Sequence, residues 1–271
     1  MNLDYTILVN SSDNFEDCWD PFFKLYQKYW NATGVPILLN TEWKSGYLYQ
    51  DLPIHCSMAN SKHPERRLTW SECLLNALDQ VETELVLYLQ EDYFLEQAVD
   101  DHLINELLTL MLANKEIKYI GLTHFGNTAP FKPWAKDKRL CKVLNTRYRI
   151  STQAGIWRKD TLKSYLKPEE NGWMFEIFGT QRAKKKRDLF LTLNREIYNE
   201  ANPAMLYTHT GIIKGKWHPA MPALFKLNQI EMDFSERGIY KEKPYLLRKL
   251  ETGLKLVKDP FLFYNGMRGK S

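Results

Sequence analysis

Two adjacent carboxylates, Glu91 and Asp92, close an apolar run in the sequence LVLYLQEDYFL at residues 85–95. Five of its first six residues are apolar or aromatic, which predicts a strand that is buried on both faces. In open α/β sheets ligands bind beyond the carboxyl ends of the strands, and a hard divalent cation takes one or two carboxylates there, with water and substrate phosphate oxygens completing its shell. The alternative is that both acids begin a loop and cap a helix around Gln97.

A single carboxylate, Glu176, stands in the apolar segment NGWMFEIFG at residues 171–179. Its neighbours are Trp173, Met174, Phe175, Ile177 and Phe178. Apolar surroundings raise the pKa of a carboxylic acid because they desolvate its charged form, and a general base that works near neutral pH benefits from that rise. The pattern favours a catalytic base. The alternative is a structural glutamate that forms an ion pair with Arg158 or Arg182.

Strands and helices that alternate along the chain would position these acids. Residues 5–10, 35–41, 85–90 and 117–123 read as strands because they are β-branched and apolar. Helices are expected from Trp19 to Trp30, after residue 69 and from residue 100, and Thr69 with Glu72 forms a capping-box pattern. The fold class is therefore α/β, with a mixed, mostly parallel sheet flanked by helices.

The composition fits an ordinary globular protein. The chain has 271 residues, of which 44% are hydrophobic and 26% are charged, and a formal net charge of +4. The basic run 182–187 has no interleaved aromatic residues, so it reads as a solvated face and no nucleic-acid partner is predicted. The four cysteines are dispersed, which predicts reduced thiols, and the start has no signal-peptide pattern, so the expected location is cytoplasmic.

Three segments together resemble bacterial nucleotide-sugar-dependent glycosyltransferases of the GT-A fold, a Rossmann-like fold, of the surface-polysaccharide type. They are YTILVNSSDNFEDCWDPFFKLYQKYW, RRLTWSECLLNAL and LVLYLQEDYFL, and the similarity covers most of residues 5–218. In that fold the strand ends in an acidic DxD motif, which holds Mg²⁺ or Mn²⁺ on the diphosphate of the donor. The resemblance implies that Asp92 is a direct metal ligand and that Glu91 contacts the metal or the ribose. Gln90 stands where the family has its first aspartate.

The resemblance also implies donor-binding residues in two loops. Ser11 and Asp13 follow the first predicted strand, where Asp13 would accept a hydrogen bond from the base or a ribose hydroxyl. The alternative is a turn with a helix cap. The segment STQAGIWRKDTL at 151–162 would line the donor sugar, with Gln153 as a donor-binding residue. In inverting members a carboxylate in a segment with tryptophan deprotonates the acceptor hydroxyl, and Glu176 matches that position.

The segment THTGIIKGKWHP at 208–219 completes the predicted site. Lys214 and Lys216 would neutralise the departing diphosphate. The resemblance implies a nitrogen ligand to the metal from His209, with His218 as the other candidate. Trp217 would stack on the base or the sugar, and a place in the core is the alternative.

The last residues differ in character from the rest. Basic residues at 241–258 interleave with leucines, a pattern that fits contact with an anionic membrane, packing on the catalytic domain, or a homodimer. We expect residues 1–222 to form the GT-A catalytic domain and residues 223–271 to form a C-terminal helical extension that packs on it.

The expected function is transfer of a sugar from a nucleotide-diphosphate sugar to a saccharide or lipid-linked saccharide acceptor in surface polysaccharide synthesis, with inversion. One alternative is a sugar nucleotidyltransferase, but the loop after the first strand lacks the glycines and basic residues that such enzymes use. The other is a non-catalytic carbohydrate-binding or assembly protein on a transferase scaffold, which would explain Gln90.

Overall fold

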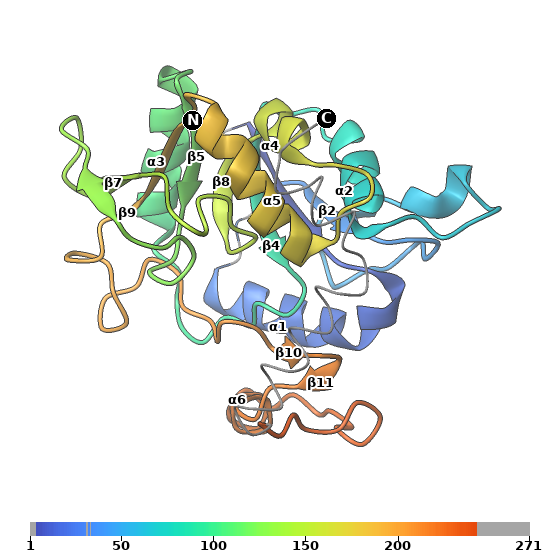
Figure 1. Ribbon diagram of the computed structural model, residues 1–271. Coiled ribbons are helices and arrows are strands. Elements are labelled where there is room, and N and C mark those ends of the chain that lie inside the picture. The colour runs from blue at the N-terminus through green and yellow to red at the C-terminus, as the bar shows by residue number, and fades with distance from the viewer. Residues whose placement is uncertain (1–3, 31, 33, 243–271) are drawn as a thin grey trace. The chain divides into compact units, whose positions relative to one another are not determined.

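The computed structural model describes residues 4–242 except 31 and 33 (Figure 1). The chain forms two compact units that divide between His209 and Thr210. The predicted boundary after residue 222, and the packing of residues 223–271 on the catalytic domain, stay predictions. The basic and leucine-rich pattern lies almost entirely outside the described residues, which end at Glu242.

The first unit alternates strands with helices, as the sequence pattern predicts. Its strands are β1 (Tyr5–Asn10), β2 (Ile37–Asn40), β3 (Ile54–Cys56), β4 (Leu85–Gln90), β5 (Ile117–Gly121), β6 (Phe131–Pro133), β7 (Leu140–Val143), β8 (Gly155–Arg158) and β9 (Leu189–Leu193). Its α-helices are α1 (Trp19–Tyr29), α2 (Trp70–Asp79), α3 (Asp101–Ala113), α4 (Lys159–Tyr165) and α5 (Gly172–Lys185), and the 3₁₀ helices are η1 (Asp13–Cys18) and η2 (Ala59–Lys62).

Among the described residues, nine strands form one sheet in the order β3-β2-β1-β4-β8-β5-β9-β7-β6. Pairing is parallel from β3 to β4 and between β5 and β9, whereas β8 is antiparallel to both of its neighbours. Only β7 and β8 run against the other strands of this sheet. The predicted mixed, mostly parallel α/β sheet is therefore confirmed.

Helices cover the sheet because its central strands are apolar on both faces. Every residue of β1 is buried, and so are Leu85 to Leu89 of β4. Helices α2, α4 and α5 contact one another, and in Figure 1 α4 and α5 cross in front of β8 and β4. The capping box predicted at the start of α2 is confirmed, since Thr69 and Glu72 each bind the other's backbone N–H.

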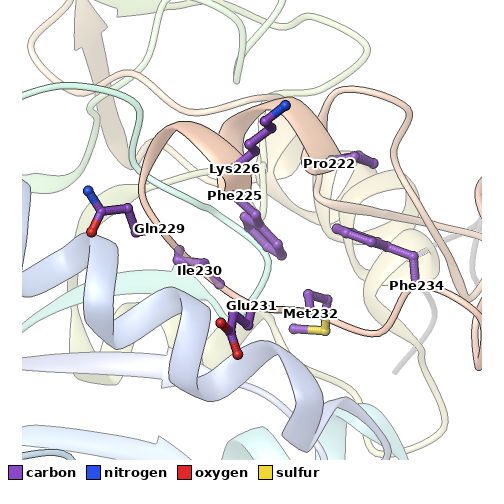
Figure 2. Close-up of a pocket in the computed structure, with 8 residues that line it drawn as sticks. All are labelled: Pro222, Phe225, Lys226, Gln229, Ile230, Glu231, Met232 and Phe234. Atoms are coloured by element: carbon purple, nitrogen blue, oxygen red, sulfur yellow. The ribbon is translucent and has the colours of Figure 1, made fainter.

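The second unit is small over its described residues. It holds the hairpin β10 (Ile212–Ile213) and β11 (Lys216–Trp217), and the helix α6 (Met221–Leu227). Lys214 and Gly215 form the hairpin turn with φ of 51° and 78°, which a two-residue turn of this kind requires. Helix α6 and the chain after it line an open pocket of about 330 Å³, whose apolar residues are Pro222, Phe225, Ile230, Met232 and Phe234 (Figure 2).

Candidate active site

Glu91 and Asp92 follow β4 directly, at the centre of the sheet. Only 7% and 6% of their surfaces are exposed, although both side chains are acidic. The helix-capping alternative is wrong, because α3 begins at Asp101 and its cap is Asp100, whose carboxylate accepts a hydrogen bond from the backbone N–H of Leu103 at 3.0 Å. The two acids thus come directly after a buried strand, as the sequence predicts.

Glu176 lies on α5, and its carboxylate is held by Thr152. The backbone N–H and the hydroxyl of Thr152 both donate to Oε1 of Glu176, at 2.7 and 2.9 Å. Burial raises the pKa of Glu176, and the hydrogen bonds from Thr152 oppose that rise because they stabilise the charged form. Glu176 therefore has the electrostatic setting that the apolar segment predicts.

The ion-pair alternative for Glu176 is wrong, because both candidate arginines hold other carboxylates. Arg158 pairs with Glu84 and donates to the backbone oxygens of Ile117 and Met111. Arg182 reaches both oxygens of the buried Glu170 at 2.5 Å. Arg182 is thus no part of the solvated face predicted for residues 182–187, whereas Lys185, Lys186 and Arg187 are exposed.

Buried tyrosines connect the acid pair with Glu176. The hydroxyl of Tyr93, the residue after Asp92, donates to the backbone oxygen of Thr152 at 2.9 Å. Burial raises the pKa of Tyr93, and the charges of Asp92 and Glu176 raise it further. Burial likewise raises the pKa of Tyr88 in β4, and both Glu91 and Glu176 contribute. The acid pair and Glu176 therefore lie around the same two tyrosines.

Gln153 belongs to the same network. Its Oε1 accepts a hydrogen bond from the hydroxyl of Tyr207 at 3.0 Å, and its Nε2 donates to the backbone oxygen of His209 at 3.4 Å. The ring of Tyr207 stacks on Tyr93 with 4.4 Å between centroids, and His209 packs edge-on against Phe125 at 4.3 Å. Tyr207 thus connects Gln153 with Tyr93, the residue after Asp92, and Gln153 contacts the backbone of His209.

A pocket of about 210 Å³ opens at the carboxyl ends of β1 and β2. Glu42 is buried in its wall and binds the guanidinium of Arg67 with both carboxylate oxygens. Burial raises the pKa of the Cys73 thiol to about 12, so this thiol stays protonated at neutral pH. The lining residues are Ser11, Ser12, Glu42, Arg67, Leu68, Trp70 and Cys73. The pocket combines hydroxyls, an arginine and an indole, which suits a polar aromatic ligand.

Trp70 connects this pocket with the helix that carries Glu176. A Cβ at Gly172, the first residue of α5, would lie 3.3 Å from the indole of Trp70, so the helix start rests on that ring. Trp70 also contacts Phe175, with 5.7 Å between ring centroids. Trp173 lies in the same first turn and is 41% exposed. An exposed indole therefore lies one helical turn before Glu176.

Asp13 organises the loop after β2. One of its carboxylate oxygens accepts from the backbone N–H of Glu42 at 2.9 Å, and the other accepts from those of Trp43 and Lys44 at 3.0 and 3.2 Å. Ser12 precedes η1 without a side-chain cap. Ser11 lines the pocket and accepts a hydrogen bond from the indole N–H of Trp19. Contact of Ser11 or Asp13 with a donor stays a prediction.

The predicted metal ligands do not form a ready three-residue cluster. Within the described part of the chain, no three His, Cys, Asp or Glu side chains come together as a metal site. The ring of His209 lies against Phe125, and its backbone oxygen accepts a hydrogen bond from Gln153. A metal site of Glu91, Asp92 and His209 stays a prediction. Two hard oxygen ligands at a strand end still suit Mg²⁺ or Mn²⁺, provided that the diphosphate and water supply the other ligands.

Lys214, Lys216 and Trp217 belong to the second unit. Both lysines are exposed at the hairpin. Trp217 is fully buried and packs edge-on against Phe225 and Phe234, which is the core alternative that the sequence left open. His218 follows, and its Nδ1 accepts a hydrogen bond from the backbone N–H of Ala220 at 3.1 Å. Contacts of the two lysines and Trp217 with a donor stay predictions.

Sequence reasoning missed the residues that arrange the site. Thr152 holds Glu176, Trp70 supports α5, and Arg67 pairs with Glu42 in the pocket wall. Threonine, tryptophan and arginine in these segments have no spacing that signals such contacts. The sequence RRLTWSE just before α2 was the available signal, since loops at strand ends carry ligand-binding residues.

No family model matches the chain, and neither does any curated protein sequence. Among solved structures, the chain is similar to S. aureus TarS residues 1–349 in complex with UDP. The sequence identity is 13%, the TM-score is 0.47, and the match covers 86% of this chain and 68% of that one. Glucosyl-3-phosphoglycerate synthase from Mycobacterium tuberculosis, with Mn²⁺, UDP-glucose and phosphoglyceric acid, matches with 10% identity, a TM-score of 0.46 and coverage of 86% and 82%.

A mycobacterial protein matches with 11% identity and a TM-score of 0.45, over 71% of this chain. The chain spans 65% of that protein and 41% of the chain in another structure of S. aureus TarS. No helix among the described residues is both long and apolar enough to cross a membrane.

Proposed function

We propose that the chain is an inverting glycosyltransferase of the GT-A type that transfers a sugar from a nucleotide-diphosphate sugar to a saccharide or lipid-linked saccharide of a surface polysaccharide. The observation that carries this proposal is the placement of Glu176. A carboxylate with a raised pKa and the acid pair Glu91 and Asp92 lie around the same buried tyrosines, at the carboxyl end of β4. A base and a diphosphate site are the two groups that such a transfer needs.

The nucleotide would bind in the pocket at the ends of β1 and β2. In doubly wound sheets this edge receives nucleotides. Arg67 and Trp70 offer a planar cation and an indole to an aromatic base, and Ser11 offers a hydroxyl. Asp13 shapes the pocket through the backbone of residues 42–44, next to the lining residue Glu42.

The diphosphate would lie toward Asp92 and Glu91. These two carboxylates would hold Mg²⁺ or Mn²⁺, which neutralises the charge that builds on the leaving phosphate oxygens. Gln153 lies in the adjacent loop and would contact the donor sugar. Neutralisation of the diphosphate by Lys214 and Lys216 remains part of the proposal from the sequence. The cation held by Glu91 and Asp92 would thus be the group that opposes negative charge on the leaving group.

The reaction would be a single displacement. Glu176 takes the proton of the acceptor hydroxyl, the acceptor oxygen bonds to the anomeric carbon, and the bond from that carbon to the diphosphate oxygen breaks with its electron pair on the nucleotide diphosphate. Proton transfer to such a base contributes about 10²- to 10⁴-fold to the rate. Trp173 would support the acceptor, because an exposed indole stacks on the apolar face of a sugar ring.

A donor screen tests this proposal. Nucleotide-diphosphate sugars are measured for thermal stabilisation of the chain and for turnover, with and without Mn²⁺, in wild type, Glu176→Gln and the control Glu169→Gln, whose side chain is exposed. We expect at least one donor to stabilise all three proteins, and Glu176→Gln alone to lose about 100-fold or more in transfer rate. Unchanged transfer in Glu176→Gln, or no stabilisation by any donor, contradicts the proposal.

A further inference from the structure

We infer that Thr152 is the positioning residue of the base, and that it connects Glu176 with the loop that carries Asp92. This inference rests on the proposed function and extends it to a residue that neither the sequence pattern nor the comparisons single out. Thr152 makes three hydrogen bonds that serve the site: two donated to Oε1 of Glu176, at 2.7 and 2.9 Å, and one accepted from Tyr93 at 2.9 Å.

The first consequence concerns the orientation of the carboxylate. Both donors of Thr152 meet the same oxygen of Glu176, so they fix the plane and the rotation of the carboxyl group relative to β8 and its preceding loop. A base must lie within hydrogen-bond reach of the proton that it removes, and a fixed first oxygen fixes the position of the second. Thr152 therefore orients Glu176 for the acceptor.

The second consequence concerns protonation. Burial favours the neutral acid at Glu176, whereas the two bonds from Thr152 favour the carboxylate, which is the form that a base needs. The titratable side chains around Glu176 are Tyr88, Tyr93 and Tyr119, and burial raises the pKa of each of them, so they stay neutral near pH 7. The Ser151 side chain also lowers the pKa of Glu176, but Thr152 provides two of the bonds, so loss of its hydroxyl shifts the balance toward the protonated acid.

The segment around Thr152 is held from two sides. Tyr93 binds the backbone oxygen of Thr152, and its ring stacks on Tyr207. The hydroxyl of Tyr207 accepts from the backbone N–H of Ala154 and donates to Gln153, both at 3.0 Å. Two stacked tyrosines thereby tie residues 152–154 to the loop that begins with Glu91 and Asp92. The base and the acid pair share one support.

The test uses three threonine variants of the full chain. Thr152→Val keeps the branched shape and the backbone bond but removes the hydroxyl, and Thr152→Ser restores the hydroxyl. Thr208→Val is the matched control, because the hydroxyl of Thr208 donates at 2.7 Å to Glu96, a carboxylate outside the proposed reaction. The first readout is the pH dependence of kcat. The second needs no substrate: Glu176→Gln is added to each variant, and the resulting change in Tm is measured across the pH range.

We expect Thr152→Val to move the acidic limb of the kcat profile to higher pH and to lower kcat on that limb about tenfold, since a hydrogen bond to a charged group has that order of effect. Thr152→Ser should restore the limb, and Thr208→Val should leave it in place. The stabilisation that Glu176→Gln gives near pH 7 should also be larger in the Thr152→Val protein, because the remaining carboxylate has lost a donor.

Two outcomes separate the inference from the function on which it rests. If neither the acidic limb nor the Tm difference changes in Thr152→Val, Thr152 does not position Glu176 and the inference is overturned. If the Tm difference changes while the acidic limb stays in place, the bond from Thr152 to Glu176 is supported, but Glu176 is not the base and the proposed function falls.

Discussion

Gly155 in β8 is the position where one added methyl group should disturb the site most. It lies between Tyr88 of β4 and Gly121 of β5. A Cβ at residue 155 would lie 2.5 Å from Cε2 of Tyr119, whereas ordinary contacts are 3.4–4 Å. The Tyr119 ring would have to move by about 1 Å. It is fully buried against Trp157 and Phe190, with centroids at 4.3 and 5.7 Å, so this movement disturbs the core.

Gly155→Ala should therefore cost about 2 kcal/mol, within the range for overpacked cores. With an m-value of about 2 kcal/mol/M, the urea midpoint would fall by about 1 M. Gly179→Ala in α5 is the matched control, because its nearest neighbours would lie at 3.5–3.6 Å and alanine favours a helix. This control should be neutral or slightly stabilising.

A double-mutant cycle locates the cause. Tyr119→Leu removes the Cε2 atom, so Gly155→Ala should cost much less in that background than in wild type. Urea unfolding of the four proteins gives the coupling energy. An unchanged urea midpoint in Gly155→Ala, or the same cost in both backgrounds, would show that Tyr119 does not lie against β8 as described.

Three further changes have defined outcomes. Burial raises the pKa of Glu176 above its ordinary value of 4.5, so the folded state binds a proton more tightly than the unfolded state. Stability therefore falls as pH rises from 4.5 through the raised pKa of the folded state. Glu176→Gln should thus raise Tm at pH 7, and this gain should disappear below pH 4.5. Arg182→Met should cost about 3–5 kcal/mol in urea unfolding, since it leaves the buried Glu170 without its partner; a loss below 1 kcal/mol would contradict a buried ion pair. Trp173→Ala should raise the acceptor KM and leave kcat nearly unchanged, while the exposed control Leu144→Ala should change neither; equal effects of the two would exclude a specific role for Trp173.

The strands and the acids at their ends were predictable because both depend on local patterns. The run 85–90 is apolar at alternate and adjacent positions alike, and it forms β4 with the acids just beyond it. The antiparallel placement of β8 between β4 and β5 was not predictable, because the apolar residues of Gly155–Arg158 fit either direction. Strand direction depends on the connections in space.

The site shows the same division. Glu176 was predictable because its apolar neighbours imply a raised pKa. Thr152 was not, because its bond to Glu176 joins residues 24 positions apart. For Trp217 a stacking role and a core role were equally consistent with the sequence, and only the packing against Phe225 and Phe234 shows that the indole is buried. The reacting groups can be predicted from their neighbours in the sequence, whereas the residues that hold them in place are known only from tertiary contacts.

The central claim is that Asp92 serves the donor and Glu176 the acceptor in one reaction. The most direct measurement compares Asp92→Asn with Glu176→Gln in two assays: thermal stabilisation by the nucleotide-diphosphate sugar with Mn²⁺, and transfer to an acceptor. We predict that Asp92→Asn loses both the stabilisation and the transfer, whereas Glu176→Gln keeps the stabilisation and loses the transfer. Full donor stabilisation in Asp92→Asn, or intact transfer in Glu176→Gln, would contradict this division of roles.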